Sequence, residues 1–432
     1  MSLNEKVSPT AAFYTLGCKV NQYETEKIRE DMEAFGFKTV PFPGPADVLI
    51  VNSCTVTTTA DSKSRSAIRR ATRQNPNALI IATGCSTELD PLTFMRINGV
   101  DLVVPNAEKT KIAERIAARF PTLSRNGAKP TLPRLRTRAV VKVQDGCDQF
   151  CAYCAVPLAR PTRNSRDLED VLSEIRALAN VGYKEVVLTG IRLGSYNDGQ
   201  NDLPKIVQNA AEIDGIERVR LSSIEVWEVS QKLIEVMGHS KVCRHLHIPL
   251  QSGDDNILKA MRRPYNTEFY SQKISQARKA IPNPAITTDV MVGFPGETEE
   301  AFQNTCRFVR KMRFSRLHVF RYSVRPDTRA AKFPDQVPPD VKERRSAELI
   351  ALGEQLSAEF AEEFIGRTVR VLVERRRGRT AILSGLTDNY VEVTFSGPES
   401  LRGQMVSVCV TGRQNSELVA DLIDAETDGI RG

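Results

Sequence analysis

Three closely spaced cysteines are the residues of this chain best suited to metal chemistry. The run QDGCDQFCAYC places Cys147, Cys151 and Cys154 with three and then two residues between them. A zinc site of this kind needs four ligands, and no fourth cysteine or histidine lies nearby in the sequence. Three thiolates instead suit a 4Fe-4S cubane in which one iron keeps an open position.

That open iron has a chemical use. It can chelate the amino and carboxylate groups of S-adenosylmethionine (SAM), after which an electron from the cluster cleaves a carbon–sulfur bond and yields a 5′-deoxyadenosyl radical. The alternative is a chance grouping of cysteines in a loop. The radical chemistry is favoured because the run directly follows Ala139 to Val143, an apolar stretch typical of a strand.

A second set of cysteines is spread along the first quarter of the chain. Cys18, Cys54 and Cys85 end the runs FYTLGC, VLIVNSC and LIIATGC, so each follows a strand candidate. The carboxyl ends of parallel strands share one sheet edge, where three such thiolates can converge on a second cluster. Three unrelated buried cysteines are the alternative.

The remaining cysteines and two histidines favour structural roles. Cys243, Cys306 and Cys409 lie before a strand, in a helical stretch and in a β segment, where packing is expected. His245 and His247 share one face of a strand candidate, and we expect hydrogen bonds rather than metal ligation.

The elements that must position these residues follow a βα alternation in the first 125 residues. Apolar runs predict strands over Ala11 to Leu16, Val48 to Val51 and Leu79 to Ala82. Helical spacing predicts a helix over Gln22 to Phe35, with Asn21 as its N-cap. The pattern predicts a parallel α/β domain over residues 1–125, followed by a linker over 126–138.

The alternation repeats on a larger scale over residues 139–366. Six apolar runs predict strands: Ala139 to Val143, Glu185 to Thr189, Arg218 to Ser222, His245 to Gln251, Ile286 to Val292 and Arg316 to Tyr322. Six βα units indicate a partial (β/α)6 barrel with its chemistry at the carboxyl ends of the strands. Residues 367–432 alternate apolar and polar side chains, which predicts a small antiparallel β-barrel.

The bulk composition agrees with a multidomain, cytoplasmic protein. The chain has 432 residues, nine cysteines and a formal net charge of +7. Because the cytosol keeps thiols reduced, this number of cysteines favours metal or redox chemistry over disulfides. We expect no membrane association, since no signal peptide or long apolar run is evident. The positive charge suits a nucleic-acid partner.

These features together resemble the methylthiotransferase family of radical SAM enzymes over essentially the whole chain. The segments TLGCKVNQYETE, VKVQDGCDQFCAYC, LHIPLQSGDDNILKAMRRPY and HVFRYSVRPDTRAAKFPDQV are similar to the bacterial branch that acts on N6-threonylcarbamoyladenosine at tRNA position 37. The resemblance implies a radical SAM barrel, a TRAM-like RNA-binding barrel, two 4Fe-4S clusters and two uses of SAM. One SAM molecule methylates sulfur on the auxiliary cluster and another supplies the radical for insertion at C2.

The resemblance also implies partners and site residues. The partners are the anticodon stem-loop of tRNA and a low-potential electron donor such as flavodoxin or ferredoxin. The positions expected to contact SAM are Tyr153, Gly190, Gln251 and Ser252. The basic residues Arg375, Arg376, Arg377 and Arg379 of the terminal domain are expected to contact RNA phosphates.

Several positions depart from the family pattern. They are Ser86, Thr87, Glu88, Pro161, Asn164, Val226 and Asp327. Other readings within the family are methylthiolation of isopentenyladenosine-37 or of a ribosomal protein aspartate. A different class is an iron–sulfur protein that binds RNA or senses redox state, and SAM cleavage separates that class from an enzyme.

Overall fold

The computed structural model describes residues 8–120, 123, 136–378 and 381–423. They form two compact units. The first unit comprises Met1–Pro133, Asp145–Arg163 and Ser323–Ala331. The second unit comprises Arg134–Gln144, Asn164–Tyr322 and Lys332–Gly432. Both sets of cysteines singled out above therefore lie in the first unit.

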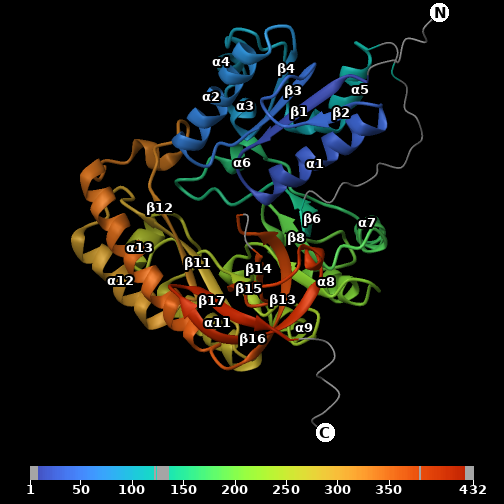
Figure 1. The fold of residues 1–432 in the computed structure, drawn as a ribbon. Coiled ribbons are helices and arrows are strands. Elements are labelled where there is room, and N and C mark those ends of the chain that lie inside the picture. Colours follow the sequence, from blue (N-terminus) through green and yellow to red (C-terminus); the bar gives the residue numbers. More distant parts are fainter. Residues whose placement is uncertain (1–7, 121–122, 124–135, 379–380, 424–432) are drawn as a thin grey trace, which may run out of the picture. The chain divides into compact units, whose positions relative to one another are not determined.

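The first unit is built on a parallel five-stranded sheet with the order β2-β1-β3-β4-β5 (Figure 1). The strands are β1 Thr10–Thr15, β2 Lys38–Val40, β3 Val48–Ser53, β4 Leu79–Gly84 and β5 Leu102–Val104. The three strands predicted from apolar runs are β1, β3 and β4, which are direct neighbours in the sheet. The expected parallel α/β fold of this region is confirmed.

Helices cover both faces of this sheet, as the alternation of side chains requires. Val48 and Ile50 of β3 pack in one cluster with residues of the helices α1 and α5, while Leu49 and Val51 pack with Ile68 of α2 on the other face. The helices of the unit are α1 Lys19–Ala34, α2 Thr58–Gln74, α3 Cys85–Leu89, α4 Pro91–Met95, η1 Asn106–Lys111, α5 Ile112–Ala117 and α6 Val156–Ala159.

The start of α1 differs from the prediction. The helix begins at Lys19 with Cys18 as its N-cap, and Asn21 lies inside the first turn. The Asn21 side chain is buried and donates its Nδ2 hydrogens to the carbonyl oxygens of Leu16 at 2.8 Å and Ser53 at 2.9 Å. Asn21 thus ties the helix to the ends of two strands, and its assignment as the N-cap was wrong.

The second unit contains the predicted partial barrel. One sheet has the order β7-β6-β8-β9 and the other β10-β11-β12, with parallel bridges Val219↔Val242 and Ser223↔His247 between their neighbouring segments. The strands are β6 Arg138–Asp145, β7 Asn164–Ser165, β8 Glu185–Gly190, β9 Arg218–Leu221, β10 His245–His247, β11 Ala285–Val292 and β12 Arg316–Arg321. All six predicted strands are present, although β10 stops at His247 rather than Gln251.

Helices surround these strands and enclose one apolar core that includes Val141, Leu188, Leu221, Leu246 and Ile286. The helices are η2 Leu193–Ser195, α7 Leu168–Asn180, α8 Leu203–Ala211, η3 Val226–Glu228, α9 Gln231–Val236, α10 Asp255–Ala260, α11 Thr267–Ala280, α12 Glu299–Met312, η4 Arg329–Lys332 and α13 Pro339–Glu362, with η4 spanning the boundary between the units. Among the residues described, no helix is both long and apolar enough to cross a membrane.

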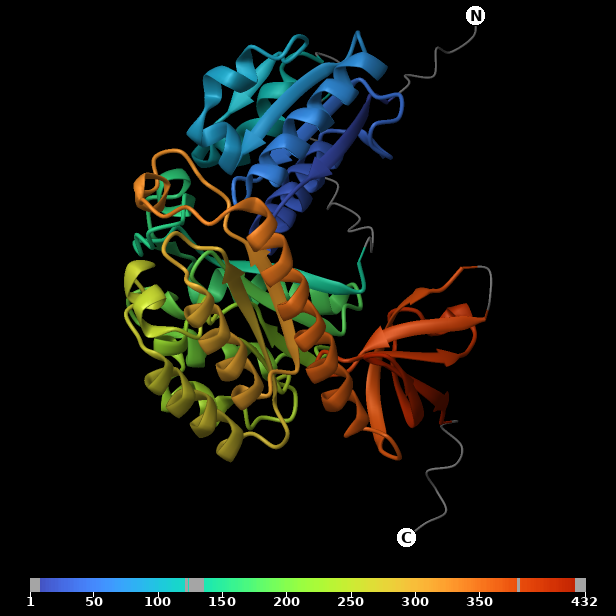
Figure 2. The same cartoon turned by 90° about the vertical axis from the view of Figure 1, so that its left-hand side faces the viewer.

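The C-terminal strands form a closed barrel that follows α13 in the chain (Figure 2). Its order is β13-β14-β15-β17-β16, with β13 Thr368–Arg376, β14 Ile382–Leu386, β15 Glu392–Ser396, β16 Met405–Gln414 and β17 Glu417–Leu422. A short helix, η5 Glu399–Leu401, precedes β16. Val371, Val373, Val393, Val408 and Val410 fill the core, as their alternation predicted. The barrel is not purely antiparallel, because β15 and β17 pair in parallel.

Two buried arginines attach this barrel to the second unit's larger sheet. Arg218 donates to the carbonyl oxygens of Leu386 at 2.9 Å and Arg370 at 2.6 Å, and Arg220 donates to the Thr387 carbonyl oxygen at 3.0 Å. The fully buried Glu185 accepts from Arg220 Nε at 2.7 Å. These charge-assisted bonds fix the C-terminal barrel against the base of the β8 and β9 strands.

Candidate functional site

The three early cysteines follow three neighbouring strands at one edge of the first unit's sheet. Cys54 comes directly after β3, Cys85 directly after β4, and Cys18 three residues after β1. Because β1, β3 and β4 are parallel neighbours, their carboxyl ends lie side by side. The structure therefore brings these cysteines to the same edge, as the sequence predicted.

The thiols of these cysteines are near enough to influence one another. Burial, and less strongly the neighbouring Cys85 and Cys18, raise the pKa of Cys54 to about 11. Surrounding protein atoms, and less strongly Cys85, also raise the pKa of Cys18, although part of that residue reaches the surface. A thiol in this environment becomes a thiolate when a metal coordinates it.

A glycine permits the close approach of two of these elements. Gly17 has φ +98°, and a Cβ atom at this position would lie 2.7 Å from the Cys54 Sγ. Any other residue would therefore collide with the thiol. The LGC sequence before α1 thus contains a cysteine and also the glycine that makes room for Cys54. The sequence analysis did not identify this feature.

These cysteines suit a cluster better than a single metal ion. Among the described residues, no group of three or more His, Cys, Asp or Glu side chains has the arrangement that holds a single metal ion. The ligands of one zinc ion all lie about 2.3 Å from one centre, whereas the thiolates of a cubane each bind a different iron and lie farther apart. Three cysteines at adjoining strand ends fit the cubane.

The second set of cysteines lies in the loop between β6 and α6. Cys147, Cys151 and Cys154 are all partly buried, and Cys154 N donates to the Cys151 carbonyl oxygen at 3.1 Å. Gly146, which precedes the loop, has φ +75°, so the chain leaves the strand in a conformation that favours glycine. The predicted position of the loop directly after the first barrel strand is confirmed.

A buried arginine connects the two sets of cysteines. The Cys147 amide donates to the Arg160 carbonyl oxygen at 3.1 Å, and Arg160 Nε lies 3.3 Å from the Cys85 Sγ. The guanidinium of Arg160 also binds Glu24, at 2.8 Å from each carboxylate oxygen, and Asp145 at 2.8 Å. Sequence reasoning missed this residue, because nothing near Arg160 in the chain indicates its carboxylate partners.

A second buried arginine lies beside Cys54. Arg325 is only 7% exposed, and its Nη2 donates to the Thr55 Oγ1 at 2.5 Å. Thr55 follows Cys54 directly, and the positive charge of Arg325 lowers the pKa of Cys54 against the effect of burial. Thus Arg160 and Arg325 place positive charges beside Cys85 and Cys54.

The residues expected to contact SAM fall in both units. Tyr153 lies in the cysteine loop of the first unit, whereas Gly190, Gln251 and Ser252 lie in the second. Gly190 ends β8. Gln251 has φ +66°, and its backbone N–H donates to the Asp289 carbonyl oxygen at 2.8 Å. Ser252 is buried, with its Oγ 3.4 Å from the Thr305 Oγ1 of α12.

A charged group near the carboxyl ends of β8 and β9 escaped the sequence analysis. Arg192 Nε donates to the Glu228 Oε1 at 2.6 Å, and Arg263 pairs with Glu225. Burial raises the pKa of Glu228 to about 7, against the opposing effect of Arg192. The guanidinium carbons of Arg192 and Arg263 lie 5.8 Å and 5.1 Å from the centroid of the Trp227 ring.

The arginines expected to bind RNA lie on the C-terminal barrel and have carboxylate partners. Arg375 and Arg377 both bind Glu392, at 2.7 and 2.8 Å, and Arg377 also binds Glu417 at 2.8 Å. Arg376 binds Glu399 at 3.1 Å. Arg379 lies outside the described residues. An RNA phosphate would have to compete with these glutamates, whose exposed ion pairs are individually weak.

The histidine pair has the expected structural role. His245 Nε2 and His247 Nδ1 each lie 2.9 Å from the Thr287 Oγ1, and His247 Nε2 lies 3.1 Å from Asp289. Cys243 and Cys306 are buried within the second unit. These residues therefore belong to the packing of the barrel.

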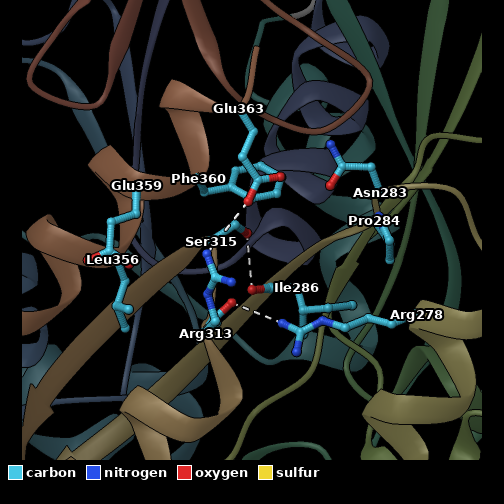
Figure 3. Close-up of a pocket in the computed structure, with 10 residues that line it drawn as sticks. All are labelled: Arg278, Asn283, Pro284, Ile286, Arg313, Ser315, Leu356, Glu359, Phe360 and Glu363. Carbon is cyan, nitrogen blue, oxygen red and sulfur yellow. Dashed lines mark hydrogen bonds and ion pairs between the residues drawn. The ribbon is translucent and has the colours of Figure 1, made fainter. Parts of the chain in front are cut away.

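A hollow of about 290 Å³ in the second unit lies away from the carboxyl ends of the barrel strands (Figure 3). Its lining includes Pro284 and Ile286 at the start of β11 and Ser315 just before β12, together with Glu363 after α13. The hollow therefore lies at the amino ends of these strands, opposite the ends where chemistry occurs in such barrels.

Comparisons with known proteins agree with the fold. The Radical SAM superfamily matches residues 141–309, and the Uncharacterized protein family UPF0004 matches residues 10–105. A solved structure of the radical SAM methyltransferase TsrM from Kitasatospora setae superposes with a TM-score of 0.55 at 14% identity, covering 87% of this chain and 78% of that chain. This likeness concerns the fold alone.

The sequence relatives identify the family. The threonylcarbamoyladenosine tRNA methylthiotransferase MtaB of Bacillus subtilis (strain 168) is 42% identical over 419 residues, covering 92% of this chain and 93% of that protein. A tRNA-2-methylthio-N(6)-dimethylallyladenosine synthase of Carboxydothermus hydrogenoformans is 36% identical, covering 92% and 95%. The chain belongs to the radical SAM methylthiotransferase family, whose chemistry requires a 4Fe-4S cluster and SAM.

Proposed function

We propose that this enzyme inserts a methylthio group at C2 of N6-threonylcarbamoyladenosine-37 in tRNA. The observation that carries the proposal is the meeting of Cys18, Cys54 and Cys85 at one sheet edge, in the same unit as the loop of Cys147, Cys151 and Cys154. The 42% identity to the MtaB of Bacillus subtilis, against 36% to the dimethylallyladenosine synthase of Carboxydothermus hydrogenoformans, favours the threonylcarbamoyl substrate.

Each set of cysteines holds one 4Fe-4S cluster in this proposal. Cys147, Cys151 and Cys154 would hold the cluster that provides the electron for SAM cleavage, and Cys18, Cys54 and Cys85 would hold a cluster that provides the sulfur for transfer. An adenine C–H bond is neither acidic nor electrophilic enough for ordinary side chains, so a radical is needed to open this position. A low-potential flavodoxin or ferredoxin is the proposed electron donor.

The chain's own residues prepare the auxiliary position. Gly17 leaves room for Cys54, and the Arg160 guanidinium sits against Cys85 while Glu24 and Asp145 hold it. At the strand ends of the second unit, Gly190, Gln251 and Ser252 are the proposed SAM contacts, with Tyr153 from the cysteine loop. The C-terminal barrel binds the anticodon stem-loop through Arg375, Arg376, Arg377 and Arg379.

The substrate is tested by nucleoside mass spectrometry of tRNA from a strain lacking this gene. We expect loss of 2-methylthio-N6-threonylcarbamoyladenosine and its return when the gene is restored. In parallel, purified enzyme receives tRNA carrying either threonylcarbamoyladenosine or isopentenyladenosine. Preferred methylthiolation of the isopentenyl substrate would instead identify the second candidate, which the 36% identical synthase supports.

A further inference from the structure

The segment that contains Arg325 is fastened to the first unit near both sets of cysteines. The hydroxyl oxygens of Thr58 and Ser323 lie 2.9 Å apart, and Ala330 N donates to the Ala152 carbonyl oxygen at 2.8 Å. Thr58 begins α2 shortly after Cys54, and Ala152 follows Cys151. Ser323–Ala331 therefore spans from one set of cysteines to the other.

A tight turn fixes the backbone of Arg325 in this segment. The Arg325 carbonyl oxygen accepts hydrogen bonds from the Thr328 Oγ1 at 2.8 Å and from the Thr328 amide at 3.3 Å. Asp327, between them, has φ +67°. The guanidinium is then directed to the buried Thr55, where Nη2 donates at 2.5 Å.

One donor of this buried guanidinium is unsatisfied. Arg325 Nε is buried, and no hydrogen-bond acceptor within the described residues reaches it. An unmet buried donor costs about 1–3 kcal/mol, and more when it is charged. Its position beside Cys54 is therefore informative, because a sulfur-rich anionic group held by that cysteine would supply the missing acceptor.

Arg160 is another buried arginine at this sheet edge and can be compared with Arg325. It is equally buried and also lies at the sheet edge, but Glu24, Asp145 and the Cys85 Sγ already accept its hydrogen bonds. The described residues include no carboxylate paired with Arg325. The two arginines thus differ in that only Arg325 retains a buried donor and an unbalanced charge for a ligand.

We propose that Arg325 is a positioning residue that donates a hydrogen bond from Nε to a sulfur of the auxiliary cluster and raises the reduction potential of that cluster. Hydrogen bonds to sulfur and nearby positive charge both stabilise the reduced, more negative cluster. The inference rests on the proposed function, since it requires a cluster on Cys18, Cys54 and Cys85. It assigns to a residue in the distant RYSVRPDT segment a direct role at that cluster.

The test is an anaerobic redox titration, followed by electron paramagnetic resonance. The full chain carries Cys147→Ala, Cys151→Ala and Cys154→Ala, so that the auxiliary cluster alone gives the signal. Arg325→Gln and Arg325→Lys are compared in this background. The exposed Arg69→Gln on α2 is the matched control in the same unit.

We expect Arg325→Gln to lower the potential by at least the equivalent of a tenfold change in the reduced-to-oxidised ratio, which is 59 mV for a one-electron couple. Arg325→Lys retains the charge and should give a smaller fall, and Arg69→Gln should give none. If Arg325→Gln assembles no cluster, the Lys variant carries the test. A potential unchanged in the Arg325 variants would overturn the inference alone, whereas absence of a cluster in the parent would overturn the proposed function as well.

Discussion

At the scale of single residues, Arg160 is a buried charge that contacts the cysteine edge. Its guanidinium is bound by Glu24 and Asp145, and Glu24 is also paired with the buried Lys109. Replacing all members of a buried ion-pair network with apolar residues often costs little stability. Removing one member is costly, because the other buried charges lose their partner. The network should therefore be sensitive to any change at Arg160.

Arg160→Leu should destabilise the full chain by about 3–5 kcal/mol, because Glu24 and Asp145 lose their shared cation in a buried setting. Chemical denaturation of the metal-free protein measures the change. Arg163→Ala, three residues away, is the control: the Arg163–Asp148 pair is half exposed, and its loss should cost about 0–1 kcal/mol. Equal effects of the two substitutions would contradict the role given to the buried network.

Glu228 should make the stability of the fold depend on pH. Burial raises the pKa of this carboxyl to about 7, whereas an unfolded glutamate has a pKa of about 4.5. Between these values the folded protein binds more protons than the unfolded chain, so this group's contribution to stability declines as pH rises from 4.5 to 7. Glu228→Gln should remove a pH-dependent difference on the order of 3 kcal/mol. Unfolding curves that keep the same pH dependence in both proteins would refute this.

The iron content tests the ligands themselves. Anaerobically reconstituted protein should hold about eight irons in two 4Fe-4S clusters, and changing Cys147, Cys151 and Cys154 to Ala should leave about half. Iron analysis and absorption spectra measure both values. Changing the buried Cys243 and Cys306 instead should leave the iron content intact. Full iron in the triple variant, or tightly bound zinc, would exclude the assignment.

Most departures from the family pattern have a local explanation at this scale. Val226 opens the η3 helix, a first helical position at which proline is also favoured, and Asp327 has the positive φ that favours glycine. Thr87 donates to the Gly84 carbonyl oxygen at 2.7 Å, and Glu88 accepts from the Asn106 amide at 2.8 Å. The Ser86 hydroxyl binds Asp61. These side chains stabilise α3 beside Cys85.

At the scale of secondary-structure elements, RNA binding by the C-terminal barrel would require its arginines to leave their glutamates. Replacing Arg375, Arg376 and Arg377 with Gln should weaken tRNA binding and reduce the slope of log affinity against log salt by about one to three. Conversely, Glu392→Gln frees Arg375 and Arg377 from their shared carboxylate and should strengthen binding. Filter binding over a series of salt concentrations measures both effects. An unchanged slope in both variants would show that this face does not contact RNA.

The strands were predictable because their signal is local. Apolar runs such as Val48 to Val51 identify a buried strand, and the rule that parallel strands end at one edge brings Cys18, Cys54 and Cys85 together. The partners that satisfy buried charges were not predictable, because they depend on contacts between distant segments. Arg325 meets Thr55 across 270 positions, and Arg160 meets Glu24 across 136.

The same limit explains the differences at the ends of elements. Asn21 was predicted to cap α1, but its amide bonds to Leu16 and Ser53 can form only when two strands lie beside the helix. The parallel pairing of β15 with β17 depends on how the C-terminal barrel closes rather than on its alternating pattern. The glutamates that bind Arg375 and Arg377 come from later strands of the same barrel.

At the scale of the whole molecule, we propose a division of labour between two sets of cysteines. The 147–154 loop leaves the first strand of the partial barrel, whereas Cys18, Cys54 and Cys85 follow strands of the parallel sheet. The first set should generate the radical and the second should deliver sulfur. The two roles are separable, because SAM cleavage yields 5′-deoxyadenosine whether or not sulfur is transferred.

The most direct test incubates each triple Ala variant anaerobically with SAM, dithionite and threonylcarbamoylated tRNA, and quantifies 5′-deoxyadenosine and methylthiolated nucleoside separately. The variant lacking Cys18, Cys54 and Cys85 should still cleave SAM but form no methylthiolated product. The variant lacking Cys147, Cys151 and Cys154 should form neither product. Methylthiolation by the first variant, or SAM cleavage by the second, would contradict the division of labour.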